Sequence, residues 1–141
     1  MVISPVGLTV PGASAHTLQV AEQAFQAFAT GLASGYWSAF LACLSDDFTF
    51  WFPAGPFKGL NHGKARAEEF FTLASTVFPE GLTVVVQQVA SNPTTVIYEV
   101  RSSGVMLGQP YDNQAAVAFE IKDGNVCAYR EYLGVIFQLG Q

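Results

Sequence analysis

The sequence has little charge, and positive charge in particular is scarce. Charged residues make up 12% of the 141 residues, and only six are lysine or arginine, which leaves a formal net charge of -5. Proteins that bind nucleic acid neutralise phosphates with a clustered basic surface, whereas the basic residues here are scattered along the chain. We therefore expect no nucleic-acid partner.

Cysteine is also scarce, and long hydrophobic runs are missing. Cys43 and Cys127 lie far apart and form no CxxC motif, as is typical of reduced thiols in a cytoplasmic protein. No apolar run reaches the ~18 residues that a membrane-spanning helix requires. The apolar first residues lack a basic leader and are interrupted by Pro5 and Pro11, unlike a signal peptide. The sequence predicts a cytoplasmic protein with no membrane partner.

Motifs for metals and cofactors are missing too. His16 and His62 are the two histidines, and neither clusters with carboxylates at a ligand spacing. No GxGxxG, Walker or GxSxG motif occurs. We therefore expect no metal and no cofactor. His62 lies in a loop and is either a surface residue or a base at the rim of a pocket.

Hydrophobic residues, in contrast, are abundant. They make up 50% of the chain, which is too many for a disordered protein and suggests apolar surface in a pocket or a subunit contact. The length fits a single domain. We expect an N-terminal arm at residues 1–16 and one domain at residues 17–141.

The spacing of these hydrophobic residues predicts helices first and most of the strands last. Apolar residues recur every three or four positions in the first half, and β-rich runs separated by short turns fill the second half. This order favours an α+β fold with a mostly antiparallel sheet. The predicted helices are at about 17–35, 37–44 and 64–77, and the predicted strands at 48–52, 82–89, 94–102, 111–122 and 125–137, with a loop at 53–63.

Several phrases of the sequence carry a family resemblance. They are LSDDFTFWFPAG, YEVRSSG, GQPYDNQAAVAFEIKDGNV and YREYLGVI. In this order they resemble the SnoaL-like branch of the NTF2-like superfamily, which includes ketosteroid isomerases, polyketide cyclases and limonene epoxide hydrolases. The resemblance covers residues 20–137. It implies a cystatin-like cone, in which a strongly curved sheet wraps three N-terminal helices and the open end holds a small apolar or cyclic ligand. It also implies a homodimer formed through the outer face of the sheet.

The resemblance argues against a standard ketosteroid isomerase. Those enzymes place an aspartate before the Pro-x-Gly of the first strand, a tyrosine on the first helix and a protonated aspartate on the sheet. The matching positions here are Phe52, Phe28 and approximately Val117. None of these side chains can move a proton.

The epoxide hydrolases and polyketide cyclases suggest other catalytic residues. By resemblance, Glu131 matches an acid on the last strand in both groups, and Glu99 and Arg101 match the acid and arginine of the hydrolases in reversed order. Gly134 stands where the SnoaL-like branch often has an aspartate. The resemblance therefore implies Glu99, Arg101 and Glu131 as catalytic candidates.

Strand alternation leaves the position of these charged residues open. Glu99 and Arg101 share one face of their strand, which either lines the pocket or carries a solvated ion pair. Glu131 shares a face with Cys127 and Tyr129, while Arg130 lies on the opposite face. Either face of this last strand can be the inner one. Two acids on neighbouring strands would allow general acid-base chemistry, and a structural hydrogen-bond network is the alternative.

Further residues are candidates for binding a ligand. Tyr111 and Asn113 match a Tyr-x-Asn of the SnoaL-like branch and either orient a ligand at the pocket mouth or close a turn. Phe28, Trp51 and Phe52 either line the cavity or belong to the core. We expect a metal-independent enzyme that performs acid-base chemistry on an apolar cyclic substrate, as an isomerase, cyclase or epoxide hydrolase does. The alternative is a non-catalytic ligand-binding or dimeric assembly module.

Overall fold

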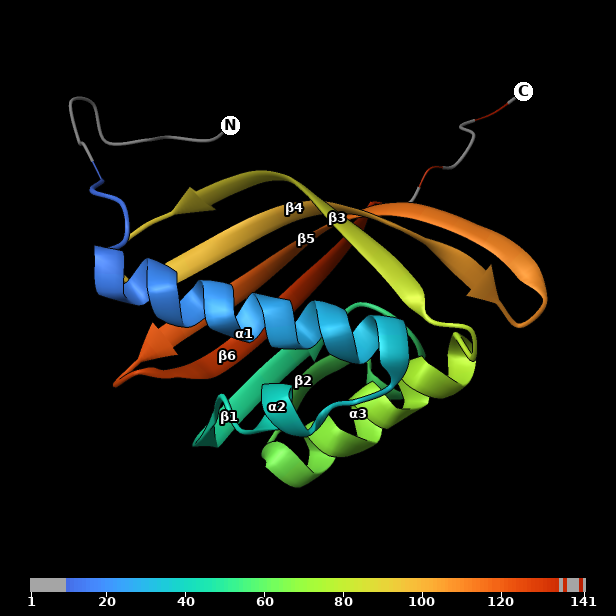
Figure 1. Ribbon diagram of the computed structural model, residues 1–141, viewed down its shortest axis with the longest axis horizontal. Helices are drawn as coiled ribbons and strands as arrows, with labels where there is room; N and C mark the ends of the chain where they lie inside the picture. Colours follow the sequence, from blue (N-terminus) through green and yellow to red (C-terminus); the bar gives the residue numbers. More distant parts are fainter. Residues whose placement is uncertain (1–9, 135, 137–139, 141) are drawn as a thin grey trace.

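The computed structural model describes residues 10–134, 136 and 140. Three helices and six strands form an α+β fold in which a curved sheet covers the helices (Figure 1). The elements are α1 (Ala15–Ser34), α2 (Ser38–Leu41), β1 (Leu44–Phe52), the 3₁₀ turn η1 (Gly55–Phe57), β2 (Gly59–His62), α3 (Lys64–Val77), β3 (Leu82–Ser91), β4 (Thr95–Met106), β5 (Gln109–Lys122) and β6 (Asn125–Gly134).

The ends of α1 follow from its sequence. The Ser14 side chain accepts a hydrogen bond from the backbone N–H of Thr17 and so caps the first turn. Gly35 ends the helix in the left-handed conformation, with φ of 82°, which glycine adopts without steric strain. Between these ends, Phe25 and Phe28 are buried against the sheet.

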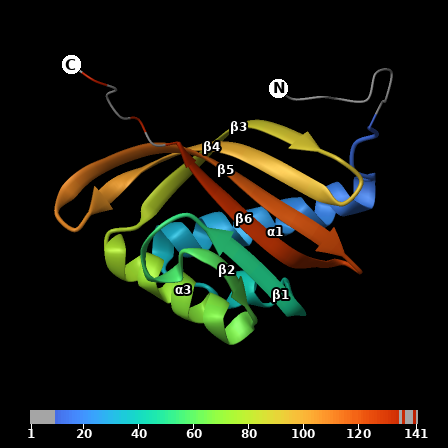
Figure 2. The same ribbon diagram turned by 180° about the vertical axis from the view of Figure 1, so that it is seen from behind.

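The sheet has the strand order β2-β1-β6-β5-β4-β3. Strands β3 to β6 form an antiparallel meander, and β1 pairs with β6 in parallel. All three helices lie on one side of this sheet, as the two opposite views show (Figures 1 and 2). We call the side that faces the helices the concave face and the other side the outer face.

Strand β4 shows how the two faces differ. Val100 and Ser102 are buried on the concave face, whereas Glu99 and Arg101 point to the outer face and are exposed. The concave face packs against an aromatic core. In that core, the ring of Phe28 lies 5.9 Å from that of Phe119, centroid to centroid.

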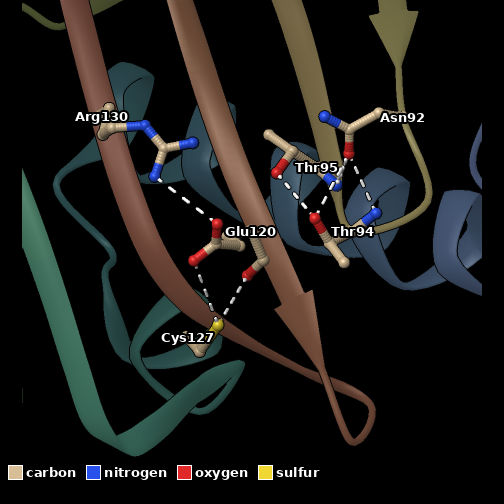
Figure 3. A network of polar contacts seen from close by, with 6 residues as sticks. All are labelled: Asn92, Thr94, Thr95, Glu120, Cys127 and Arg130. Atoms are coloured by element: carbon tan, nitrogen blue, oxygen red, sulfur yellow. Dashed lines mark hydrogen bonds and ion pairs between the residues drawn. The ribbon is translucent and has the colours of Figure 1, made fainter. Parts of the chain in front are cut away.

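A β-bulge in β6 changes the expected alternation. Glu120 pairs with Ala128 and Ile121 with Val126, so Cys127 between them has no partner. Its thiol bonds to the backbone oxygen of Glu120, whose carboxylate also lies 3.9 Å from Arg130 (Figure 3). The bulge therefore turns Cys127 away from the face of Tyr129, which corrects the shared face predicted by simple alternation.

The nearby turn between β3 and β4 is closed by a polar side chain. Asn92 accepts hydrogen bonds from the backbone N–H groups of Thr94 (3.0 Å) and Thr95 (2.9 Å) (Figure 3). Asparagine favours such turns because its side-chain oxygen replaces a backbone acceptor. This turn fixes the start of β4.

The α+β class and the curved, mostly antiparallel sheet confirm the sequence prediction, and α3 has the predicted bounds. Several bounds differ. The second helix is shorter than expected, the first strand begins already at Leu44, strand β2 lies inside the expected loop, and strands β3 to β5 are longer than predicted. Residues 135 and 137 of the expected last strand lie outside the described residues. Residues 1–9 of the expected arm lie outside the described residues, and α1 begins at Ala15, inside that arm. None of the described helices is long and apolar enough to cross a membrane.

Candidate ligand cavity

A cavity of about 320 Å³ lies between the concave face, α3 and the loop after β1. Its wall is almost entirely apolar and includes eight aromatic rings. The aromatic residues are Phe28, Phe52, Phe57, Phe70, Phe71, Phe78, Tyr111 and Tyr129. Apolar cavities with a few convergent polar groups are typical of small-molecule sites.

The polar groups come from three neighbouring strands. Ser102 lies on β4, Tyr111 on β5, and Tyr129 and Glu131 on β6. Tyr129 and Glu131 are two residues apart on one strand, so both side chains point into the cavity. The phenol of Tyr129 donates a hydrogen bond to Oε1 of Glu131.

The environment of this pair changes the pKa values of both groups. Burial raises the pKa of the Glu131 carboxyl, and the hydrogen bond from Tyr129 opposes this rise in part. Burial, together with the neighbouring charge of Glu131, raises the pKa of Tyr129 well above its usual value. Tyr129 therefore stays protonated, while the ionised form of Glu131 is disfavoured.

Tyr111 is the second phenol of the cavity. Its oxygen accepts a hydrogen bond from the side-chain amide of Asn113 at 3.0 Å, and Ser102 lies beside it. Burial raises the pKa of Tyr111, so this phenol also keeps its proton. Asn113 itself does not line the cavity but contacts Tyr111 through this hydrogen bond.

The structure separates the three charged candidates. Glu131 lies in the cavity, which answers the open question of whether Glu131 or Arg130 faces inward. Glu99 lies on the outer face, where it accepts a hydrogen bond from Gln88 at 3.2 Å. Arg101 is also on that face and binds Asp112 through two hydrogen bonds of 3.0 and 2.8 Å. Glu99 and Arg101 therefore cannot touch a ligand in this cavity.

The aromatic candidates divide in the same way. Phe28 and Phe52 line the cavity. Trp51 instead lies on the outer face, with its ring 5.3 Å from that of Tyr132. The ring of Phe52 packs on Phe70 of α3. Because side chains alternate along a strand, the neighbouring Trp51 points to the opposite face.

Two polar residues of the cavity were missed by the sequence analysis. Tyr129 is two positions before Glu131, and this spacing is a signal that could have placed it in the site. Ser102 is likewise two positions after the buried Val100 and so lies on the same face of its strand. A lone serine, however, is not a distinctive signal in a sequence. The apolar loop residues that close the cavity had no recognisable pattern.

Two other hollows of the described surface are more polar. One lies beside Asp46, Asp47 and Lys64, and Lys64 pairs there with Asp46 at 3.7 Å. The other brings together Arg101, Tyr111 and Asn113, but Arg101 is held there by Asp112. Among the described residues, no group of three histidine, cysteine, aspartate or glutamate side chains could hold a metal ion. The aromatic cavity is therefore the candidate site.

A curved sheet that covers the helices and encloses an apolar cavity with them is typical of a cone-shaped class of pocket proteins. The chain belongs to the SnoaL-like domain family, whose sequence profile matches residues 25–129. This family and the NTF2-like fold confirm the resemblance in the sequence.

Solved structures of similar proteins support this assignment. An NTF2-like protein from Anabaena variabilis is 48% identical, with a TM-score of 0.85 over 92% of this chain and 97% of that chain. A candidate SnoaL-like polyketide cyclase from Jannaschia sp. is 23% identical (TM-score 0.73; 87% and 90% covered). An epoxide hydrolase from M. tuberculosis that resembles limonene epoxide hydrolase is 18% identical (TM-score 0.65; 82% and 84% covered). None of the curated proteins matches this chain.

Proposed function

We propose that this protein binds a small, neutral, largely apolar molecule such as a cyclic ketone, and that Glu131 moves a proton on it. The observation that carries this proposal is the Glu131 carboxyl, which lies with the Tyr129 phenol at the end of an aromatic cavity. The proposal is that of a metal-independent enzyme that performs general acid-base chemistry.

The volume of the cavity limits the ligand to about two rings. A cavity of roughly 150 Å³ holds one benzene ring, and this cavity has about 320 Å³. The described lining contains no lysine, arginine or histidine, so an anionic ligand would face Glu131 without a compensating charge. These two features favour a neutral ligand of one or two rings.

The raised pKa of Glu131 suits proton transfer. A general base works best when its pKa lies close to the working pH, and burial moves the Glu131 carboxyl in that direction. In the proposed reaction, the Glu131 carboxylate takes a proton from the carbon next to a ligand carbonyl. The resulting enolate oxygen accepts a hydrogen bond from the Tyr111 phenol, and the protonated Glu131 returns its proton to another carbon.

The number of acids in the cavity separates the possible reactions. Glu131 is the single carboxyl among the described lining residues, because Glu99 lies on the outer face. One carboxyl is enough to take up and return a proton, as isomerisation and enolate-driven cyclisation require. Epoxide opening with two acids around a water is therefore the less favoured reaction.

Deuterium exchange tests the proposal without knowledge of the natural substrate. The protein is incubated with α-tetralone in D₂O, and NMR follows deuterium uptake at the carbon next to the carbonyl. We expect wild type to accelerate uptake and Glu131→Gln to reduce the rate by about 10²–10⁴-fold. Glu99→Gln is the matched control and should keep the wild-type rate. Binding of α-tetralone without exchange would instead identify a non-catalytic binding protein.

We also propose that two copies pair through the outer face. Leu60 and Tyr132 are 60% and 48% exposed there, and Trp51 packs beside Tyr132. Exposed apolar side chains that lie together favour a protein interface. Light scattering should give a dimer for wild type and a monomer for Tyr132→Glu; a wild-type monomer at every concentration would refute the pairing.

The proposed location is the cytoplasm. Cys43 and Cys127 are both free thiols, as a reducing compartment favours. Localisation of a tagged full-length chain tests this proposal, and a secreted product would contradict it.

A further inference from the structure

The loop after β1 forms part of the boundary between the cavity and solvent. Ala54, Gly55 and Pro56 line the cavity and are also exposed. Residues that do both lie at the entrance of a cavity. We call residues 54–57, which include the buried Phe57, the rim segment.

Three of the four rim residues form the single 3₁₀ turn η1, which does not by itself attach the segment to the rest of the fold. Within the described part of the chain, its own backbone contributes the hydrogen bond from Lys58 N–H to the oxygen of Gly55, at 3.2 Å. Gly55 adopts a φ of 73°, a conformation that glycine reaches easily but that fixes nothing by itself. The position of the rim therefore depends on side chains from other elements.

Asn61 on β2 provides the first of these contacts. This side chain is 7% exposed and its amide donates hydrogen bonds to the backbone oxygens of Phe57 (2.7 Å) and Gly59 (3.1 Å). Strand β2 is paired with β1, so Asn61 is fixed to the sheet opposite Phe50. It thereby ties the end of the rim segment to the sheet.

Arg66 in the first turn of α3 provides the second contact. Its Nε donates a hydrogen bond to Oδ1 of Asn61 at 3.1 Å, and its Nη2 lies 3.5 Å from the backbone oxygen of Pro56. The guanidinium also lies 4.1 Å from the centre of the Phe57 ring, a cation–π contact. Phe57 in turn packs on Phe70 of α3 inside the cavity.

We propose that Asn61 and Arg66 set the width of the cavity entrance and so determine the size of the ligand that is admitted. They are positioning residues: they contact the rim and not the ligand. Because the guanidinium of Arg66 bridges the buried amide, the backbone of Pro56 and the Phe57 ring, its loss releases three contacts at once. This inference rests on the proposed function of the cavity.

The experiment compares Arg66→Gln with wild type in two measurements. Hydrogen–deuterium exchange of the peptide that covers residues 53–60 reports on the rim itself and needs no ligand. Calorimetry with α-tetralone, which has two rings, and anthrone, which has three, reports on ligand size. Lys64→Gln is the matched control, since it removes a cation from the same helical turn but from an ion pair with Asp46.

We expect Arg66→Gln to raise rim exchange about tenfold and to raise the affinity for anthrone relative to α-tetralone by a similar factor. Lys64→Gln should change neither. Asn61→Ala should act in the same direction, and Arg66→Lys should restore part of the wild-type behaviour through its charge. Arg66 is partly exposed, so its substitution should leave the chain folded.

Unchanged rim exchange in Arg66→Gln would overturn the inference, and so would faster exchange with an unchanged ratio of the two affinities. If wild type binds neither ketone, the proposed ligand class has failed. The exchange measurement then still decides whether Arg66 holds the rim.

Discussion

The two faces of the sheet carry the same residue types in different environments. Glu131 on the concave face borders an aromatic cavity, and burial raises its pKa, whereas Glu99 on the outer face is exposed and bonds to Gln88. The aromatic residues differ in the same way, since Phe119 is fully buried and Trp51 lies on the outer face. The comparison teaches that the face of the strand, and not the residue type, decides which side chains can act on a ligand.

The largest difference between the two faces is expected when one aromatic residue on each face is replaced by alanine. Phe119→Ala removes a ring that packs against several core aromatics, and should lower the free energy of unfolding by about 3–5 kcal/mol. Trp51→Ala on the outer face should cost about 1 kcal/mol. Urea denaturation of both variants measures the two values. Because two copies are proposed to pair through this face, both variants are compared in the Tyr132→Glu background, which should be monomeric. An equal loss for Trp51→Ala in that background would contradict the difference between the two faces.

Neutralising one glutamate on each face should give the next largest difference. The pKa of folded Glu131 lies above the ordinary value of 4.5, so the folded state holds its proton more tightly than the unfolded state. Wild type therefore loses stability as the pH rises from 4.5 through the raised pKa, and Glu131→Gln does not. We expect Glu131→Gln to be more stable than wild type by about 1 kcal/mol near neutral pH.

This gain should disappear at acidic pH, below about pH 4, where Glu131 is protonated in both states. Thermal melting across this range provides the measurement. Glu99→Gln removes a glutamate from the outer face and serves as the control, with no comparable gain. A Glu131→Gln variant that is less stable than wild type at neutral pH would contradict this expectation. It would show that the interactions of the Glu131 carboxylate more than offset the cost of its burial.

Removal of one phenol tests the coupling inside the cavity. The hydrogen bond from Tyr129 lowers the pKa of Glu131, so Tyr129→Phe should raise that pKa further. The pH dependence of deuterium exchange into α-tetralone should then move to higher pH, with a loss of roughly tenfold in rate near neutral pH. An unchanged pH profile would show that Tyr129 does not act through Glu131.

The ion pair of the outer face should give the smallest effect. Arg101 binds Asp112 and lowers the pKa of that carboxyl, but both side chains are exposed and their attraction is screened by salt. Arg101→Gln should leave the melting temperature and α-tetralone binding almost unchanged, at low and at high salt. A large loss of binding would mean that this pair influences the cavity.

The fold was largely predictable from the sequence because strong local patterns specify it. Ala67, Phe70 and Phe71 recur at helical spacing, and the helix bounds followed from the glycine and proline residues that flank it. Strand β2 was missed because its four residues, Gly59–His62, lie between glycines in a segment typical of a loop. Its partner β1 directly precedes it, but residues 53–58 between the two strands lack the signature of a short hairpin turn, so local pattern could not reveal the pairing.

The site was less predictable, because each strand offers two faces and packing selects one. Both faces of β6 are mixed in character, and the bulge at Cys127 shifts the alternation before Tyr129 and Glu131. Glu99 and Arg101 lie between buried residues of β4, and only contact with the helices shows that those buried residues face inward. The sequence therefore identified Glu99 and Glu131 as candidate acids, and the fold was needed to show that Glu131 is the one in the cavity.

The most direct test of this account is a carbon-13 NMR titration of the Glu131 carboxyl in the full chain, with Glu131→Gln used to assign the signal. The account predicts a midpoint above the ordinary value of 4.5 and a further rise in Tyr129→Phe. A midpoint at or below 4.5 would contradict the claim that the cavity prepares Glu131 for proton transfer.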